Sequence, residues 1–159
     1  MVAKALMSSK KSDWQTPEHV LELVRQVAPI GLDPCTSPDN PCRAETWYSA
    51  GGLEASWKPL AGGLVYCNPP YGRQIRAWLR KCCAAGDDRD TTIIALVPAR
   101  TDTRWWHESV YTANRICFWR GRLKFRGAPS SAPFPSALVY WGRRPEMFRS
   151  VFSPYGMIR

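Results

Sequence analysis

Two adjacent prolines, Pro69 and Pro70, constrain this chain more than any other feature. They follow the apolar run Leu64 to Cys67, and neither proline has an N–H to donate to a neighbouring strand. We therefore expect a strand that stops at Asn68 and a stiff, extended turn after it. Asn68 then lies at a strand end beside fixed peptide carbonyls, and the ring of Tyr71 follows. Such neutral acceptors suit a planar amine or amide, so we expect this stretch to hold an exocyclic NH2 group for chemistry.

A second predicted strand end carries a carboxylate. The short apolar stretch from Ile30 leads into Asp33, and Pro34 prevents a simple continuation. Ligands of open α/β sheets bind beyond the carboxyl ends of strands, where an acidic residue can hold an amino group or a ribose hydroxyl. Asp33 could as easily form a turn, because the loop Thr36 to Arg43 is rich in Ser, Pro, Asp and Asn. The chain contains neither a GxGxxG fingerprint nor a GxxxxGK phosphate loop.

Hydrophobic periodicity predicts an α/β domain around these two strand ends. Thr16, as N-cap, and Pro17 indicate the start of a helix that continues to about Ala28. Spacing of apolar residues predicts a second helix from Ile75 to Cys82 and a third from Thr103 to Tyr111. Further predicted strands are Glu45 to Tyr48, Thr91 to Val97, Arg115 to Trp119 and Ser136 to Trp141. Only 34 residues lie between Asp33 and Asn68, so the sheet should be a trimmed one, and its last two strands should form an antiparallel hairpin.

Positive charge is concentrated in the last part of the chain. The net charge is +9; residues 1–99 hold 11 basic and 10 acidic groups, whereas residues 100–159 hold 11 basic and 3 acidic groups, or +8. Such a field is typical of a polyanion binder, although a solvated surface is the alternative. Basic and aromatic residues alternate at Arg122, Lys124, Phe125 and Phe134, a pattern that suits stacking on extruded or single-stranded bases. Arg73 and Arg76 could meet phosphates or form an ordinary solvated helix face.

The spacing of the cysteines and histidines argues against a metal site, and the hydropathy of the chain argues against a membrane span or a secretory signal. The six cysteines form no CxxC pair, and the two histidines, His19 and His107, lie at no ligand spacing, so we expect no metal. No apolar run approaches the roughly 20 residues that span a bilayer, and no secretory signal is visible. We therefore expect a cytoplasmic protein with reduced thiols, no membrane partner, a flexible N-terminal tail at 1–12 and a single domain at 13–159.

The motifs, taken in order, resemble the phage-type DNA N6-adenine methyltransferases, which are related to Dam. The matching stretches are Trp14-Gln15-Thr16-Pro17, Leu32-Asp33-Pro34-Cys35, Gly52-Leu53 with Trp57, Asn68-Pro69-Pro70-Tyr71-Gly72, and Gly121-Arg122-Leu123-Lys124-Phe125 followed by Ala132-Pro133-Phe134-Pro135-Ser136. This resemblance implies a trimmed, Rossmann-like methyltransferase sheet over 13–159, mostly parallel with a C-terminal antiparallel hairpin. It also implies S-adenosylmethionine as methyl donor, duplex DNA as partner, and a phage- or prophage-encoded protein in a bacterial host.

The resemblance further implies a role for each matching residue. Asn68 and the carbonyl of Pro69 would accept hydrogen bonds from the adenine N6 amino group, and Tyr71 would stack on the base, flipped out of the duplex. The expected catalytic residues are Asn68, Pro69, Pro70 and Tyr71. The expected cofactor contacts are Trp14, Thr16, Pro17, Asp33, Pro34, Cys35 and Asn68. The expected substrate contacts are Tyr71, Arg73, Arg76, Arg122, Lys124, Phe125 and Phe134.

Two other functions stay open at this point. Asn-Pro-Pro-Tyr also occurs in methyltransferases that modify protein glutamine, against which the +8 region argues. A non-catalytic nucleic-acid-binding module on a decayed scaffold is the other alternative, because Cys35-Thr36-Ser37 carries no glycine where the family has a glycine-bearing cofactor loop. The target sequence and the oligomeric state do not follow from the sequence.

Overall fold

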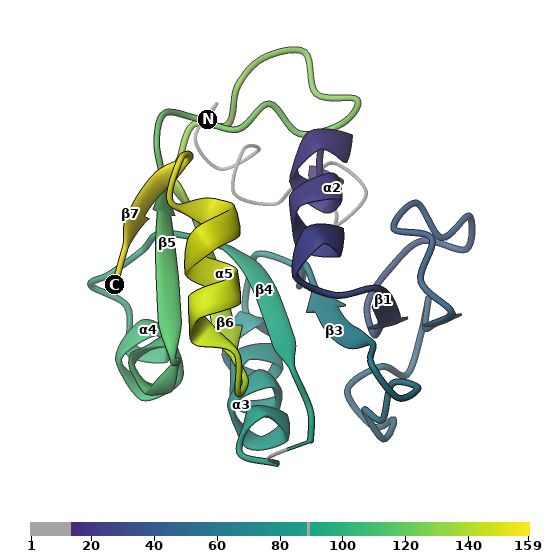
Figure 1. Ribbon diagram of the computed structural model, residues 1–159. Helices are drawn as coiled ribbons and strands as arrows, with labels where there is room; N and C mark the ends of the chain where they lie inside the picture. The colour runs from purple at the N-terminus through teal and green to yellow at the C-terminus, as the bar shows by residue number, and fades with distance from the viewer. Residues whose placement is uncertain (1–13, 89) are drawn as a thin grey trace.

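A computed structural model describes residues 14–88 and 90–159 as one seven-stranded sheet with helices on both faces (Figure 1). The predicted flexible tail at 1–12 lies outside the described residues. The strands are β1 (Ile30–Asp33), β2 (Thr46–Trp47), β3 (Leu64–Cys67), β4 (Ile93–Pro98), β5 (Arg115–Trp119), β6 (Ser136–Trp141) and β7 (Gly156–Ile158). The helices are α2 (Glu18–Val27), α3 (Ile75–Gly86), α4 (Arg104–Glu108), the 3-10 helix η2 (Val110–Thr112) and α5 (Pro145–Phe152).

The sheet is parallel in its first part and antiparallel in its second. The strand order is β2-β1-β3-β4-β6-β5-β7. The pairs β2–β1, β1–β3 and β3–β4 are parallel, whereas β4–β6, β6–β5 and β5–β7 are antiparallel. It follows that β1 to β5 all run in one direction and that β6 and β7 run in the other. The predicted antiparallel pairing of the last two predicted strands is confirmed.

Alternation of side chains along the central strands builds two hydrophobic cores. Leu64, Tyr66, Ile94 and Leu96 face one core with the buried residues of α2 and α5, and the intervening Val65, Cys67, Ile93 and Ala95 face the other with α3 and α4. Figure 1 shows α5 in front of β6 and the coil of α3 behind the sheet. Strands β3 and β4 are buried along their whole length, which explains their continuous apolar sequence.

One expectation from the sequence needs correction. Thr16 is not a helix cap: the residue before α2 is Pro17, no side chain caps the helix, and the Thr16 hydroxyl turns inward to the Tyr66 hydroxyl. Near the C-terminal end, the chain forms α5 and the edge strand β7, for which the sequence predicted no element. Tyr140 contributes to this arrangement because its buried hydroxyl accepts the N–H of Arg144 at 3.0 Å, next to the start of α5.

The strand order places a topological switch point between β1 and β3. The connection from β1 leads to β2 on one side, whereas β3 is followed by β4 on the other side. In open α/β sheets, ligands bind at the carboxyl ends of the strands that flank such a point. Here those ends are Asp33 and Cys67, with Asn68 directly after. Because β5 runs in the same direction, the loop after Trp119 leaves from the same edge and arches over it to reach β6 (Figure 1).

Candidate active site

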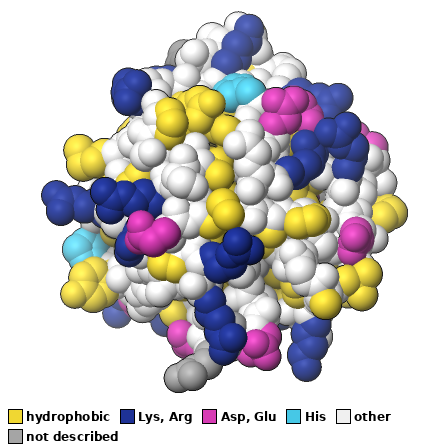
Figure 2. Space-filling view, in the orientation of Figure 1, with side chains coloured by type: hydrophobic (Ala, Val, Ile, Leu, Met, Phe, Trp, Pro, Cys, Tyr) yellow, Lys and Arg dark blue, Asp and Glu magenta, His cyan; other side chains and the backbone are white. Residues whose placement is uncertain are grey.

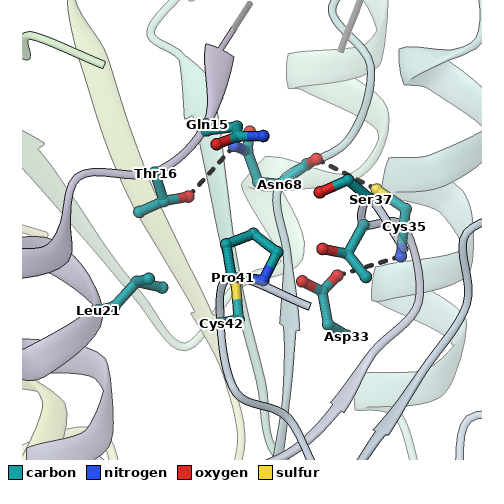
Figure 3. Close-up of a pocket in the computed structure, with 10 residues that line it drawn as sticks. Gln15, Thr16, Leu21, Asp33, Cys35, Ser37, Pro41, Cys42 and Asn68 are labelled. Atoms are coloured by element: carbon teal, nitrogen blue, oxygen red, sulfur yellow. Dashed lines mark hydrogen bonds between the residues drawn. The ribbon is translucent and has the colours of Figure 1, made fainter. Parts of the chain in front are cut away.

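A cavity of about 90 Å³ lies at this switch point (Figure 3). It brings together the chain before α2, the first turns of α2, the end of β1, the following loop and the end of β3. Its lining residues are Gln15, Thr16, Leu21, Asp33, Cys35, Thr36, Ser37, Pro41, Cys42 and Asn68. Four of the residues predicted to contact a cofactor (Thr16, Asp33, Cys35 and Asn68) therefore lie around one cavity.

Asp33 has the turn-forming role that the sequence left open. Its side chain is buried, and one carboxylate oxygen accepts the backbone N–H of Cys35 at 3.1 Å, which makes a tight turn directly after β1. The same residue lines the cavity. The Cys35 thiol in turn donates to the backbone carbonyl of Asn68 at 3.1 Å. Asp33 therefore fixes the turn that ties the end of β1 to the end of β3.

The amide of Asn68 presents a buried acceptor. Its Nδ2 donates to the carbonyl of Trp14 at 2.7 Å and to Oγ1 of Thr16 at 3.2 Å (Figure 3 draws the second bond). Because a carbonyl can only accept, the nitrogen must be the amide atom that faces Trp14. Asn68 is 8% exposed, and its Oδ1 is buried with no hydrogen-bond partner among the described residues. An orphaned acceptor of this kind is costly and marks a place where a ligand donor can bind.

Aromatic rings gather beside Asn68. Tyr71 lies nearly parallel to Trp14, with ring centroids 6.5 Å apart, and both rings contact Phe125 and Phe134 at steep angles. The Tyr71 hydroxyl donates to the carbonyl of Leu96 at 3.2 Å, and burial raises the pKa of this phenol well above its usual range. Phe125 is 1% exposed, so it packs beneath Trp14 and Tyr71 in the core. It offers no exposed face on which a base could stack, contrary to the predicted substrate contact.

An extended basic segment adjoins this aromatic group. From Arg122 to Arg126, basic residues point outward, and the intervening Leu123 and Phe125 point into the core. Arg120, Arg122, Lys124 and Arg126, here called the basic strip, are all exposed. In the described part of the chain, none of the four forms an ion pair. Figure 2 shows Lys and Arg side chains at the upper margin of the molecule, where Figure 1 places this loop.

The two arginines near the start of α3 differ from each other. Arg73 is exposed, whereas Arg76 forms a two-pronged pair with Glu108 of α4, at 2.8 Å from Nε and 2.6 Å from Nη2. Arg80 and Arg104 also lie near the Glu108 carboxylate, at 3.5 and 3.2 Å. Arg76 therefore holds α3 against α4 in this structure, an ion pair that the sequence did not predict.

The sequence predicted four of the residues that line the cavity but not the others. Trp14, Pro17 and Pro34 were predicted to contact a cofactor, but none of the three lines the cavity. Gln15, Leu21, Thr36, Ser37, Pro41 and Cys42 line it without having been predicted. The turn-forming composition of the loop was the available signal for part of this wall: Asn40 adopts φ +47° and bonds both the N–H and the C=O of Ala44, which folds the loop over the cavity.

Among residues 14–88 and 90–159, no group of three or more His, Cys, Asp or Glu side chains is placed to hold a metal ion. None of the helices within these residues is long and apolar enough to cross a bilayer.

The sequence matches the model of a known protein family. A family model described as DNA N-6-adenine-methyltransferase (Dam) matches residues 4–139 of this 159-residue chain. The match includes the cavity, the aromatic group and the basic strip. No match was found among curated proteins or among solved structures. The family match alone covers most of the chain, and it shows that this protein belongs to the DNA N-6-adenine-methyltransferase (Dam) family.

Proposed function

We propose that this protein transfers a methyl group from S-adenosylmethionine to the N6 amino group of adenine in DNA, on a trimmed Rossmann-like methyltransferase fold. The observation that carries this proposal is the buried Oδ1 of Asn68, which has no hydrogen-bond partner within the described residues and belongs to a residue that lines the cavity at the switch point. This atom offers a fixed acceptor where the family chemistry needs an amino group to be held. Membership of the family supplies the substrate class.

The cavity residues fit the cofactor chemically. S-adenosylmethionine supplies an activated methyl group, and it carries an ammonium group and ribose hydroxyls that need acceptors. Asp33 offers a buried carboxylate at the carboxyl end of β1, the place where such groups bind in open α/β sheets. Leu21, Pro41 and Cys42 offer apolar wall beside it. We assign Asp33, Thr16, Cys35 and Asn68 to cofactor binding from this geometry, and Trp14, Pro17 and Pro34 to positioning these four.

Asn68 then acts on the nucleophile. The N6 lone pair of adenine is delocalised into the ring, which makes the amino group a poor nucleophile. Two acceptors, Oδ1 of Asn68 and the carbonyl of Pro69, would hold both N6 hydrogens and favour a more pyramidal nitrogen. Preorganised groups aimed at the reacting atom stabilise the transition state without reorganisation. The N6 proton leaves to solvent after transfer, so no strong base is required.

DNA binding follows from the surface beside the cavity. The adenine must leave the duplex stack to reach Asn68, and Tyr71 offers a ring, fixed through its hydroxyl, on which the base stacks. The basic strip and Arg73 lie exposed to meet phosphates, and Phe134 is half-buried at the rim of the aromatic group. Charge contacts of this kind supply most of the sequence-independent affinity for DNA.

Incubation with labelled S-adenosylmethionine and duplex DNA, followed by nucleoside analysis, tests the proposal. We expect N6-methyladenine from the wild-type protein and a loss of about 100-fold or more in kcat for Asn68→Ala, since a preorganised hydrogen-bonding group is removed. Asn114→Ala, at an asparagine just before β5 and far from the cavity, is the matched control and should keep full activity.

Three outcomes would contradict the proposal. Label in protein glutamine and not in DNA would indicate the related glutamine methyltransferase reaction. Absence of cofactor binding in calorimetry, together with normal DNA binding, would indicate a non-catalytic module. Full activity in Asn68→Ala would remove the assigned role of Asn68.

A further inference from the structure

A chain of hydrogen bonds runs from the deepest part of the sheet to the amide of Asn68. Tyr66 lies in the middle of β3 and is fully buried, and its hydroxyl is 2.6 Å from Oγ1 of Thr16. The same Oγ1 accepts from Nδ2 of Asn68 at 3.2 Å. Tyr66 does not line the cavity. Its hydroxyl therefore meets the site through Thr16.

We propose that Tyr66, acting through Thr16, is a positioning residue that keeps the Asn68 amide in its productive orientation. This inference rests on the proposed function of Asn68. An amide nitrogen carries two hydrogens, and here Trp14 and Thr16 accept one each. Both hydrogens are used inside the protein, so the buried Oδ1 is the part of the amide that is left as an acceptor.

The arrangement selects one of two amide orientations. Rotation of the amide by half a turn would place Oδ1 against the carbonyl of Trp14 at the 2.7 Å now spanned by a hydrogen bond, and two acceptors at that distance repel. Thr16 adds the second contact, and Tyr66 fixes where the Thr16 hydroxyl lies. All these groups are neutral, and burial raises the pKa of Tyr66 well above its usual range. The orientation is therefore independent of pH under ordinary assay conditions.

The segment that carries these acceptors is held from its other side by the basic strip. The carbonyl of Gln15 accepts the backbone N–H of Arg126 at 2.8 Å, and the two residues form an isolated antiparallel bridge. The carbonyls of Trp14 and Gln15 thus join Asn68 to the loop that we assign to DNA binding. The fixed position of this segment explains how a side chain at the end of β3 is held by residues 52 to 54 positions earlier in the chain.

Kinetics of two hydroxyl deletions test the role of Tyr66. Tyr66→Phe and Thr16→Val remove the hydroxyl at each position, and we expect kcat to fall about tenfold for each, the value of one hydrogen bond in the transition state. For Tyr66→Phe, the KM for DNA and the Kd for the cofactor should stay within about twofold, because Tyr66 lies outside the cavity. Tyr140→Phe, which deletes another buried tyrosine hydroxyl remote from Asn68, should leave kcat unchanged. Equal kcat in Tyr66→Phe and Tyr140→Phe would overturn the proposal.

Nuclear magnetic resonance of the Asn68 side-chain amide gives a readout that needs no activity. The signal is assigned by its loss in Asn68→Ala, and slow exchange of both hydrogens with solvent is expected in the wild type. In Thr16→Val, and less so in Tyr66→Phe, one of the two should exchange about tenfold faster. Unchanged exchange in both variants would overturn the positioning role even if the protein methylates DNA. Faster exchange without any methylation of DNA would support the positioning role and contradict the proposed function instead.

Discussion

At the scale of single residues, the carbonyl of Trp14 requires an amide at position 68. Nδ2 of Asn68 donates to this carbonyl at 2.7 Å, and a carboxylate in its place would set two acceptors against each other in a buried site. We predict that Asn68→Asp gives a protein whose introduced carboxyl has a raised folded-state pKa, through burial and the lack of a donor. A raised pKa means that stability relative to wild type is greatest below the unfolded value of about 3.9 and falls as pH rises through the folded value.

Urea unfolding at several pH values measures this effect. The difference in unfolding free energy between Asn68→Asp and wild type should grow with pH by about 1.4 kcal/mol for each unit by which the pKa is raised. Asn68→Ala is the control, and its difference from wild type should be the same at every pH. A difference for Asn68→Asp that does not change with pH would mean that Nδ2 is not held by the Trp14 carbonyl.

The role of a residue could be predicted from the sequence where the residue belongs to a motif, but not where its role depends on packing. Asn68 and Asp33 stand at strand ends marked by prolines, and both lie at the cavity. Thr16 was predicted to cap α2, but the buried Tyr66 hydroxyl and the Asn68 amide bind its side chain instead. In the sequence, Tyr66 looks like an ordinary residue of a buried strand, because the pattern does not show that its hydroxyl contacts Thr16.

At the scale of elements, Gly52 is required by a close approach between two loops. A Cβ at this position would lie 1.7 Å from the carbonyl oxygen of Pro34 and 3.0 Å from the ring of Trp78. Pro34 directly follows Asp33, so any shift would also displace the turn at the cavity. We predict that Gly52→Ala lowers the unfolding free energy by about 1–3 kcal/mol, the usual cost of overpacking, and weakens cofactor binding in calorimetry.

Gly72→Ala is the matched control for this substitution, since a Cβ there would meet no atom within 4 Å. Its unfolding free energy should stay within about 0.5 kcal/mol of wild type. If Gly52→Ala is equally harmless, the two loops do not approach each other this closely.

The Trp57 indole donates to the carbonyl of Gly52 at 2.8 Å, which gives a physical reason for these two residues to occur together in the motif.

The contact between α3 and α4 depends on the charge of Glu108. Arg76 lowers the pKa of Glu108, first through its hydrogen bonds and then through its charge, and Arg80 and Arg104 add to the effect. A lowered pKa stabilises the fold above the usual value of about 4.3 and loses this contribution as pH falls through the folded value. We predict that Glu108→Gln has a lower Tm than wild type at pH 7 and that the gap closes below about pH 4. A gap that persists at low pH would show a packing effect instead of an ionic one.

Most elements from α2 to β6 follow from periodicity and proline punctuation. The strand Leu64–Cys67 and the hairpin strands Arg115–Trp119 and Ser136–Trp141 have the predicted bounds. The C-terminal α5 and β7 were not predicted. Phe148 and Phe152 are the only buried residues of an eight-residue helix, and β7 is a short edge strand of half-buried and exposed residues. Their formation depends on the sheet that they cover, which local sequence does not describe.

At the scale of the whole molecule, net charge is less informative than where the unpaired charge lies. Of the 11 basic groups in residues 100–159, three lie beside acids, because Arg104 pairs with Glu108, Arg115 with Glu146, and Arg143 lies 3.7 Å from Asp90. The basic strip stays unpaired within the described residues, and it lies at the carboxyl edge that holds the cavity. The position of the strip, more than the total charge, is therefore the basis on which we propose which edge of the sheet faces DNA.

The position of the strip also predicts which basic residues control the salt dependence of DNA binding. A protein that meets phosphates releases counterions, and the slope of log Kobs against log salt falls in magnitude by about 1 for each phosphate that is no longer neutralised. We predict that the double variant Arg122→Gln, Lys124→Gln lowers this slope by about 2 and weakens binding at low salt. The control, Arg143→Gln with Arg144→Gln, removes the same charge beyond the end of β6, at the opposite edge of the sheet. It should leave the slope unchanged, because these two arginines are remote from the cavity. Equal slopes for the two double variants would show that DNA senses only the net charge, and would place its path away from the strip.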